Sequence, residues 1–276
     1  MTPEHLSLDD LQPLKQTLAA AGITARKSFG QHFLLDLNLT RKIVRLAGLA
    51  PGETVVEVGP GPGGLTRALL EAGAHVVAIE KDARFVPLLG DLAVRAPGRL
   101  TVLNEDALTA TLPAGAPIVA NLPYNVGTPL LIGWLTGPLR PRSMTLMFQR
   151  EVAERIVAHP GSKTYGRLSV LSQALADARI IMDLPARAFT PPPKVASAVV
   201  QLTPRAERPA DAVVERLQAL TAAAFGQRRK MLRSSLKSLG GEALCASAGV
   251  DASLRAEDLT VAQFLALAEF GPDRSY

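Results

Sequence analysis

The stretch Val55-Val56-Glu57-Val58-Gly59-Pro60-Gly61-Pro62-Gly63-Gly64 decides the fold of this chain. Its apolar first half is typical of a buried strand, and its glycines permit a tight turn in which the backbone approaches a ligand closely. Gly59, Gly61 and Gly64 match the spacing G-x-G-x-x-G, in which a strand runs through a ligand-binding turn into a helix. The stretch therefore predicts a strand, a binding turn and a helix in succession.

Strands and helices alternate around this turn. We expect strands at 54–58, 74–80, 100–103, 117–120 and 144–148, and helices at 65–71, 83–95 and 129–135. Further helices are expected at 151–158 and 167–177, and further strands at 179–183 and 196–202, which would close the end of the sheet. The alternation predicts an α/β fold with a Rossmann-like parallel sheet, helices on both faces, and ligands at the carboxyl ends of the strands.

The two ends of the chain have a different, helical pattern. Leucines at 8, 11, 14 and 18 predict a helix over 8–21, and the C-terminal helices are expected at 213–225, 228–239, 243–248 and 261–270. Residues 203–210 hold two prolines and several charges, which is typical of a linker. We therefore predict an N-terminal helical extension (1–25), an α/β domain (26–205) and a small all-helical C-terminal domain (206–276).

Composition excludes several classes of protein. The 276 residues contain one cysteine, Cys245, so a disulfide framework and a multi-thiolate metal site are excluded. The four histidines lack the HExxH spacing of zinc hydrolases, and we expect no metal. The sequence has no run of 18 apolar residues, so we expect no membrane span. Residues 1–10 lack the pattern of a signal peptide. A cytoplasmic protein with a modest net charge of +5 is expected.

The prolines of the turn favour a cofactor without phosphates. A pyrophosphate needs several backbone N–H donors at the helix start, and Pro60 and Pro62 supply none. S-adenosylmethionine needs close backbone approach and carboxylates instead. Glu80 ends the next strand, where a carboxylate binds ribose hydroxyls, and Asp106 follows the third strand, where it can accept from the adenine amine. A nicotinamide dinucleotide and a purely structural turn are the alternatives.

The tetrapeptide Asn121-Leu122-Pro123-Tyr124 follows the fourth strand, at the same edge of the sheet. The exocyclic amine of adenine is a weak nucleophile, and the Asn121 carbonyl with a nearby backbone carbonyl can accept its two hydrogens and direct its lone pair at a methyl donor. Tyr124 can stack on a base that is flipped out of its helix. A simple proline turn with the tyrosine in the core is the alternative.

Several motifs together resemble the KsgA/RsmA family of small-subunit ribosomal RNA adenine dimethyltransferases. The resemblance covers nearly all of residues 24–270, and its motifs are, in chain order, 26–34 (RKSFGQHFL), 57–61 (EVGPG), 80–82 (EKD), 105–107 (EDA), 121–125 (NLPYN), 165–169 (YGRLS), 189–195 (FTPPPKV) and 227–230 (QRRK). The resemblance implies a class I S-adenosylmethionine-dependent methyltransferase domain. It also implies the transfer of four methyl groups to N6 of two adjacent adenosines near the 3′ end of 16S rRNA, in the 30S subunit or its precursor.

The resemblance also assigns roles to residues. The implied cofactor-binding residues are His32, Leu34, Gly59, Gly61, Glu80, Asp106 and Asn121, and the candidate catalytic residues are Asn121, Leu122, Tyr124 and Phe189. The three prolines after Phe189 stiffen its loop, so that its ring could form a second stacking face opposite Tyr124; a merely packed phenylalanine is the alternative. The family usually has asparagine where this chain has His32, which can still donate and accept hydrogen bonds.

A basic run lies near the C-terminus, between residues 225 and 240. It holds five basic residues and no acid: Arg228, Arg229, Lys230, Arg233 and Lys237. On one continuous helix, Arg229, Arg233 and Lys237 would form a single stripe, which suits an RNA phosphate backbone; a solvated face is the alternative. The run carries a charge equal to that of the whole chain.

Other functions are compatible with parts of this pattern. A large-subunit adenine methyltransferase of the macrolide-resistance type and a non-catalytic ribosome-assembly factor are the alternatives to a 16S rRNA dimethyltransferase. The motifs at 121–125 and 165–169 favour the small-subunit enzyme, and the intact Asn121, Tyr124 and Phe189 favour catalysis. We expect the protein to act as a monomer.

Overall fold

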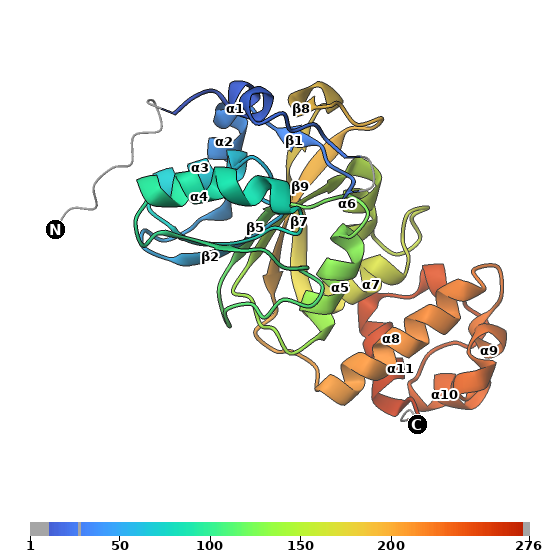
Figure 1. Ribbon diagram of the computed structural model, residues 1–276. Coiled ribbons are helices and arrows are strands. Elements are labelled where there is room, and N and C mark those ends of the chain that lie inside the picture. The colour runs from blue at the N-terminus through green and yellow to red at the C-terminus, as the bar shows by residue number, and fades with distance from the viewer. Residues whose placement is uncertain (1–10, 27–28, 273–276) are drawn as a thin grey trace. The chain divides into compact units, whose positions relative to one another are not determined.

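A computed structural model describes residues 11–26 and 29–272. Among these residues, seven strands form one sheet in the order β4-β3-β2-β5-β6-β9-β7, and two short strands form a second sheet (Figure 1). The predicted α/β, Rossmann-like fold is confirmed. Residues 1–10 of the predicted extension, and Lys27 and Ser28 of the first family motif, lie outside the described residues.

The parallel part of the sheet holds the glycine turn. Its strands and those added at its end are β2 (Thr54–Val58), β3 (His75–Ile79), β4 (Leu100–Leu103), β5 (Ile118–Asn121), β6 (Met144–Gln149), β7 (Ala176–Leu184) and β9 (Ser197–Pro204). Strands β2 to β6 pair in parallel, with Val58 opposite Ile79 and Asn121 opposite Met147. Strand β9 then runs antiparallel to β6. The carboxyl ends of β2, β3 and β5 therefore meet at one edge.

Helices connect these strands and fill the rest of the described chain. They are α1 (Leu14–Ala20), α2 (Leu37–Ala47), α3 (Gly64–Glu71), α4 (Val86–Arg95), α5 (Gly127–Thr136), α6 (Arg150–Ile156), α7 (Arg167–Leu175), α8 (Asp211–Gly226), α9 (Leu232–Ser235), α10 (Gly241–Ser247) and α11 (Val261–Phe270). The small sheet pairs β1 (Phe33–Leu34) with β8 (Phe189–Thr190). No helix in the described part of the chain is long and apolar enough to cross a membrane.

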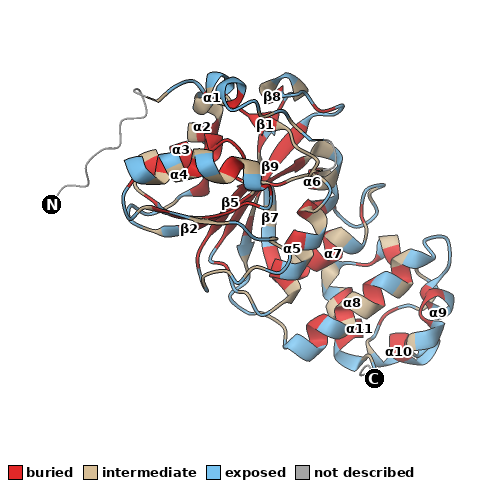
Figure 2. Ribbon diagram, in the orientation of Figure 1, coloured by how far each residue is buried: buried red, intermediate tan, exposed pale blue. Residues whose placement is uncertain are grey.

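Contacts divide the chain into two compact units. The first comprises Met1–Leu131, Leu139–Ala153 and Arg179–Leu202, and the second comprises Ile132–Pro138, Glu154–Ala178 and Thr203–Tyr276. The first unit has the sheet at its centre, and Figure 2 shows the central strands as buried stretches. In the second unit, Phe225 lies between Tyr165 and Phe264, with ring centroids 6.0 and 5.6 Å away. The domain boundary between residues 205 and 206 stays a prediction.

The predicted helix over 228–239 is wrong. Helix α8 ends at Gly226, and α9 covers only Leu232–Ser235 before a 3₁₀ turn at Lys237–Leu239. The backbone at the start of α9 pairs with a distant segment, because Leu232 N–H donates to the Leu254 carbonyl (2.8 Å) and Arg233 N–H to that of Ala252 (3.0 Å). Tertiary pairing thus overrides local helix propensity, and the basic residues do not form one helical stripe.

At the other end, the helix predicted over 8–21 begins only at Leu14 among the described residues, directly after Pro13. Proline has a fixed φ and is tolerated in the first turn of a helix but not within it. The two leucines of this helix, Leu14 and Leu18, are buried. Helix α1 therefore packs against the first unit through the apolar side that the sequence pattern predicts.

The start of α3 tolerates only glycine at position 64. A Cβ there would lie 2.6 Å from the Leu34 carbonyl oxygen and 3.2 Å from the Leu14 Cδ1 atom. We expect Gly64→Ala to lower the free energy of unfolding by about 1–3 kcal/mol, the usual cost of overpacking. Urea unfolding measures this, with Gly90→Ala in α4 as the control, because nothing lies within 4 Å of a Cβ there. The control should gain about 0.5–1 kcal/mol; equal effects of the two substitutions would contradict the clash.

Candidate active site

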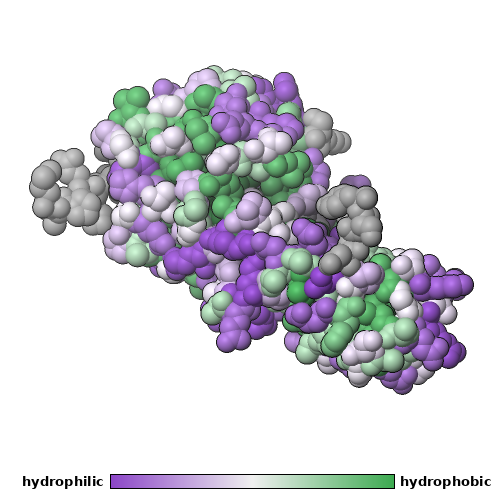
Figure 3. All heavy atoms as spheres, turned by 90° about the horizontal axis from the view of Figure 1, so that it is seen from below, coloured by the Kyte–Doolittle hydropathy of each residue, from purple (hydrophilic) through white to green (hydrophobic). Residues whose placement is uncertain are grey.

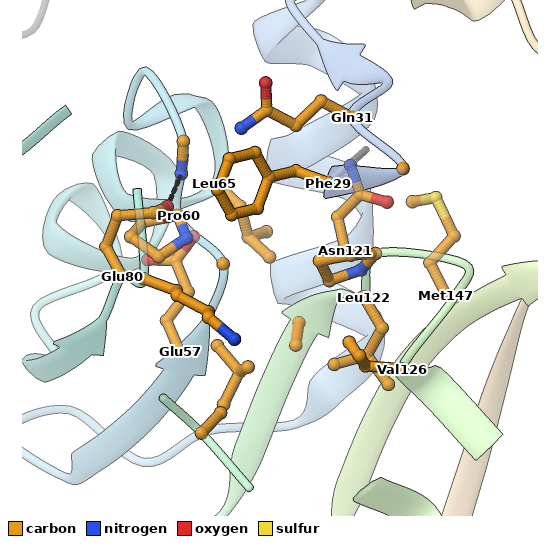
Figure 4. A pocket seen from close by; sticks show the side chains of 18 of the residues that line it. Phe29, Gln31, Glu57, Pro60, Leu65, Glu80, Asn121, Leu122, Val126 and Met147 are labelled. Atoms are coloured by element: carbon orange, nitrogen blue, oxygen red, sulfur yellow. Dashed lines mark hydrogen bonds between the residues drawn. The ribbon is translucent and has the colours of Figure 1, made fainter. Parts of the chain in front are cut away.

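A cavity of about 200 Å³ opens at the carboxyl ends of the parallel strands. Its walls are the glycine turn after β2, the residues after β3, β4 and β5, and the N-terminal residues 29–34. Figure 4 shows Glu80 and Asn121 approaching this pocket from different sides. The edge of the sheet that the sequence predicts to bind a ligand therefore holds a pocket.

The glycine turn is held to the end of β3 by Glu80. Gly59, Gly61 and Gly63 have φ values of +69°, +53° and +86°, in the left-handed region that favours glycine. Gly61 N–H donates to Glu80 Oε2 (2.9 Å), and Asp82 N–H donates to Glu80 Oε1 (2.7 Å). Glu80 is 6% exposed, and this burial raises the pKa of its carboxyl above the ordinary value. The carboxylate is thus fixed in the wall of the pocket, with lone pairs left to accept from a ligand.

The second predicted acid, Asp106, is held by Lys81, the residue that follows Glu80. Lys81 Nζ lies 2.7 Å from Asp106 Oδ2, and Leu108 N–H donates to Asp106 Oδ1 (3.1 Å). The Lys81 ammonium lowers the pKa of Asp106, which therefore stays ionised at neutral pH. The described walls also include Glu105, so the three acids Glu80, Glu105 and Asp106 outnumber the one lysine. Such a wall suits a cationic, phosphate-free cofactor better than a pyrophosphate.

Glu57 is a further pocket residue that sequence reasoning missed. It is 1% exposed, and its Oε2 atom has no hydrogen-bond partner among the described residues. Burial raises the pKa of the Glu57 carboxyl to about 8, so this group is neutral at pH 7. Its position could have revealed it, because it is the one acid in the apolar strand β2. A neutral carboxyl can donate a hydrogen bond, which an ionised carboxylate cannot.

The raised pKa of Glu57 predicts a pH dependence of stability. Between about pH 4.5 and pH 8 the folded protein keeps this proton and the unfolded chain releases it, so stability falls as pH rises through this window. We expect the free energy of unfolding to fall more steeply with pH for the wild type than for Glu57→Gln, by at most about 1.4 kcal/mol per pH unit. Urea unfolding at several pH values measures this, with Glu71→Gln as a surface control. Parallel curves for wild type and Glu57→Gln would show that Glu57 is ionised in the folded state.

Asn121 and Tyr124 lie together in the pocket, and both contact His32. The Asn121 Nδ2 group donates to the His32 carbonyl (3.2 Å), which leaves its side-chain oxygen available as an acceptor. The His32 ring stacks on Tyr124, with centroids 5.3 Å apart and planes 29° apart, and its Nδ1–H donates to the Pro191 carbonyl (2.8 Å). Tyr124 itself shares a 2.6 Å hydrogen bond with Ser197 Oγ. The histidine that replaces the usual asparagine is therefore in contact with the candidate base-stacking residue.

Three other predicted site residues are packed in the protein. Leu122 is buried, and so are Leu34 and Phe189, which face each other across the β1–β8 pair. Phe189 is 2% exposed within the apolar core, and the described walls of the pocket do not include it. The structure therefore brings Leu34 and Leu122 to the pocket and packs Phe189 in the apolar core, and the catalytic role of Phe189 stays a prediction. Pairing of β8 with β1 turns its ring toward the core.

The basic run of the second unit lies around α9. Arg229, Lys230, Arg233 and Lys237 are exposed, and Figure 3 shows hydrophilic residues along the edge of this unit where α9 lies. Arg228 differs, because its Nη2 group donates to the Tyr165 carbonyl (3.0 Å) and lies 3.4 Å from Glu257 Oε2. We therefore regard Arg228 as a residue that stabilises this unit, and the other four as the open basic surface.

The chain is similar to known proteins over almost its whole length. Residues 22–271 match the family described as Ribosomal RNA adenine dimethylase. The protein of Caulobacter vibrioides named Ribosomal RNA small subunit methyltransferase A is 68% identical over 248 residues, which cover 88% of this chain and 96% of that protein. A protein of Phenylobacterium zucineum with the same name is 64% identical over 269 residues, which cover 96% and 94%. The crystal structure of a dimethyladenosine transferase from Plasmodium falciparum shares the fold, with a TM-score of 0.73 and 24% identity over 86% of this chain and 96% of that one.

Proposed function

This chain belongs to the ribosomal RNA adenine dimethylase family, and we propose that it dimethylates N6 of two adjacent adenosines near the 3′ end of 16S rRNA. One observation carries the proposal: Asn121 and Tyr124 share a pocket with the acid-lined glycine turn. The name of relatives that are 64% and 68% identical favours small-subunit RNA over the large-subunit alternative. We further propose that the protein acts as a cytoplasmic monomer on the 30S subunit or its precursor.

The residues of the pocket fit S-adenosylmethionine. Glu80 would bind the ribose hydroxyls, Asp106 would accept from the adenine amine, and Gly59 and Gly61 would permit close approach of the backbone. Lys81 would hold the Asp106 carboxylate in place, since their hydrogen bond is 2.7 Å long. S-adenosylmethionine supplies an electrophilic methyl group when it is bound.

Asn121, Leu122 and Tyr124 would prepare the adenosine for attack. The Asn121 side-chain oxygen and the Leu122 carbonyl would accept the two amine hydrogens, which holds the nitrogen and directs its lone pair. Tyr124 would stack on the flipped base, and its hydroxyl contact with Ser197 fixes the ring. The amine becomes acidic only after it gains the methyl group, so no base is needed before transfer. His32 lies on the ring of Tyr124, and we propose that it positions this ring rather than the cofactor.

The direct test is methylation of undermethylated 30S subunits. The protein is incubated with labelled S-adenosylmethionine, and the digested RNA is analysed by mass spectrometry. We expect N6,N6-dimethyladenosine at two adjacent positions of 16S rRNA, with 50S subunits as the control substrate. Product on 50S subunits alone would favour the large-subunit alternative, and cofactor binding without product on either subunit would favour an assembly factor.

The exposed basic residues around α9 predict an effect on RNA binding without an effect on cofactor binding. We expect the triple variant Arg229→Ala, Arg233→Ala and Lys237→Ala to raise the KM for 30S subunits. The slope of log Kd against log salt should fall by roughly 2–3, because about 0.7–0.9 counterions are released per phosphate contact. Binding titrations at several salt concentrations measure the slope.

The control removes the same charge from the first unit, by alanine substitutions at the exposed residues Lys42, Arg45 and Arg95. We expect this variant to keep the wild-type slope, and both variants to keep the wild-type Kd for S-adenosylmethionine. Equal slopes for the two triple variants would show that the surface around α9 is only a solvated face.

A further inference from the structure

We propose that the N-terminal residues 11–26 and 29–31, termed the N-terminal brace, position the cofactor pocket, and that Arg84 is the residue that fastens them. The proposal rests on the proposed function, because it assumes that the pocket binds S-adenosylmethionine. The family model matches from residue 22, so helix α1 (Leu14–Ala20) lies before that match.

Helix α1 attaches the brace to the helix that follows the glycine turn. Arg67 of α3 donates from Nη1 to the Gln12 carbonyl (2.9 Å), and its side chain is only 6% exposed. Leu14 lies against the start of α3, since a Cβ on Gly64 would come within 3.2 Å of its Cδ1 atom. Leu18 packs with Phe33 and Phe85 in a separate apolar cluster. Phe33 in turn lies beside Gly61, whose added Cβ would meet its ring at 3.4 Å.

Arg84 makes the second attachment, close to the ribose-binding carboxylate. Its Nη1 group donates to the Thr24 carbonyl (3.1 Å), and its Nη2 group lies 3.4 Å from Gln31 Oε1 and 2.5 Å from Asp82 Oδ2. Gln31 Nε2 also donates to Asp82 Oδ2 (2.9 Å). Asp82 is 3% exposed, and its bonds with Arg84 lower its pKa to about 2, so the charge pair persists at neutral pH.

These bonds connect the brace to the pocket without a direct contact by Arg84. Gln31 lines the pocket, and Asp82 N–H donates to the same Glu80 carboxylate that holds the glycine turn. Arg84 is not among the described residues of the pocket walls. Its removal should therefore act on the cofactor indirectly, through the positions of Gln31 and Asp82. Because linkage is reciprocal, bound cofactor should also hold the brace more firmly.

The test replaces Arg84 by alanine and compares it with Arg142→Ala. Arg142 also makes a two-point ion pair, to Glu53 (2.8 and 2.9 Å), but at the start of β2, away from the carboxyl ends of the strands. The first readout is the Kd of S-adenosylmethionine by calorimetry. The second is the rate of tryptic cleavage after the exposed Arg26, which lies between the two residues that Arg84 contacts.

We expect Arg84→Ala to raise the Kd of S-adenosylmethionine by about 5- to 20-fold and to speed cleavage after Arg26 by a similar factor. Saturating cofactor should slow this cleavage in the wild type. Arg142→Ala should change neither value by more than about twofold, and Arg84→Lys should lie between wild type and Arg84→Ala.

Two outcomes would overturn the proposal. If wild type and Arg84→Ala bind the cofactor equally well, or if they are cut after Arg26 at equal rates, then the brace does not depend on Arg84. If the wild type itself does not bind S-adenosylmethionine, the proposed function fails instead. The cleavage rates of the cofactor-free proteins then still report whether Arg84 fastens the brace.

Discussion

Replacing Asn121 by alanine is expected to lower kcat for adenosine methylation by about 100- to 1000-fold, the usual loss when one oriented polar contact to the reacting group is removed. The physical reason is the position of the amide. Asn121 lines the pocket, and its Nδ2 group is held by the His32 carbonyl at 3.2 Å, which leaves the side-chain oxygen to accept from the base amine. Alanine removes the acceptor that aligns the lone pair of the amine. Single-turnover methylation of undermethylated 30S subunits measures the loss.

The control for Asn121→Ala is Asn38→Ala. Asn38 is exposed at the start of α2, and its replacement makes the same chemical change outside the pocket. We expect Asn38→Ala to keep the wild-type kcat, and Asn121→Ala to change the Kd of S-adenosylmethionine by less than about tenfold. A loss in Kd as large as the loss in kcat would mean that Asn121 holds the cofactor and does not orient the base.

Replacing Glu80 by alanine is expected to raise the Kd of S-adenosylmethionine at least about 100-fold. Hydrogen bonds to charged groups contribute about 1.5–3 kcal/mol each, and Glu80 would make them to the ribose. The substitution also leaves two backbone donors without their acceptor, those of Gly61 (2.9 Å) and Asp82 (2.7 Å), so the glycine turn loses its anchor. Calorimetric titration measures the Kd, and urea unfolding should show an accompanying loss of about 1–3 kcal/mol.

The matched control for this variant is Glu71→Ala. Glu71 also accepts two hydrogen bonds, both from Arg41 at 2.7 Å, but it lies at the end of α3 on a partly exposed surface. Such pairs contribute about 0–1 kcal/mol, so we expect little loss of stability and an unchanged Kd. A Kd for Glu80→Ala within threefold of the wild type would refute the assignment of Glu80 to the ribose.

The parts of the site that the sequence predicts are those at the ends of parallel strands. Glu80 and Asp106 follow strands and Asn121 ends one, and parallel pairing alone brings their backbones to one edge of the sheet. The alternation of strands and helices predicts this pairing from local patterns. The fold class and the place of the pocket could therefore be predicted without any knowledge of side-chain packing.

The parts that could not be predicted depend on pairing between distant segments. Phe189 is packed because β8 pairs with β1, whose residues lie more than a hundred positions earlier. The helix predicted over 228–239 is broken because the backbone of Leu232 and Arg233 bonds to residues 252–254. The brace likewise depends on Arg84 meeting Thr24. Local propensity carries no information on such partners.

The late position of β9 also affects how the chain folds during its own synthesis. Strand β6, at Met144–Gln149, is almost wholly buried. Its free edge pairs with strand β9, which ends only at Pro204. Until about fifty more residues have left the ribosome, this edge can pair with another nascent chain. We therefore expect aggregation of translation intermediates to be greatest for chains that stop between the ends of β6 and β9.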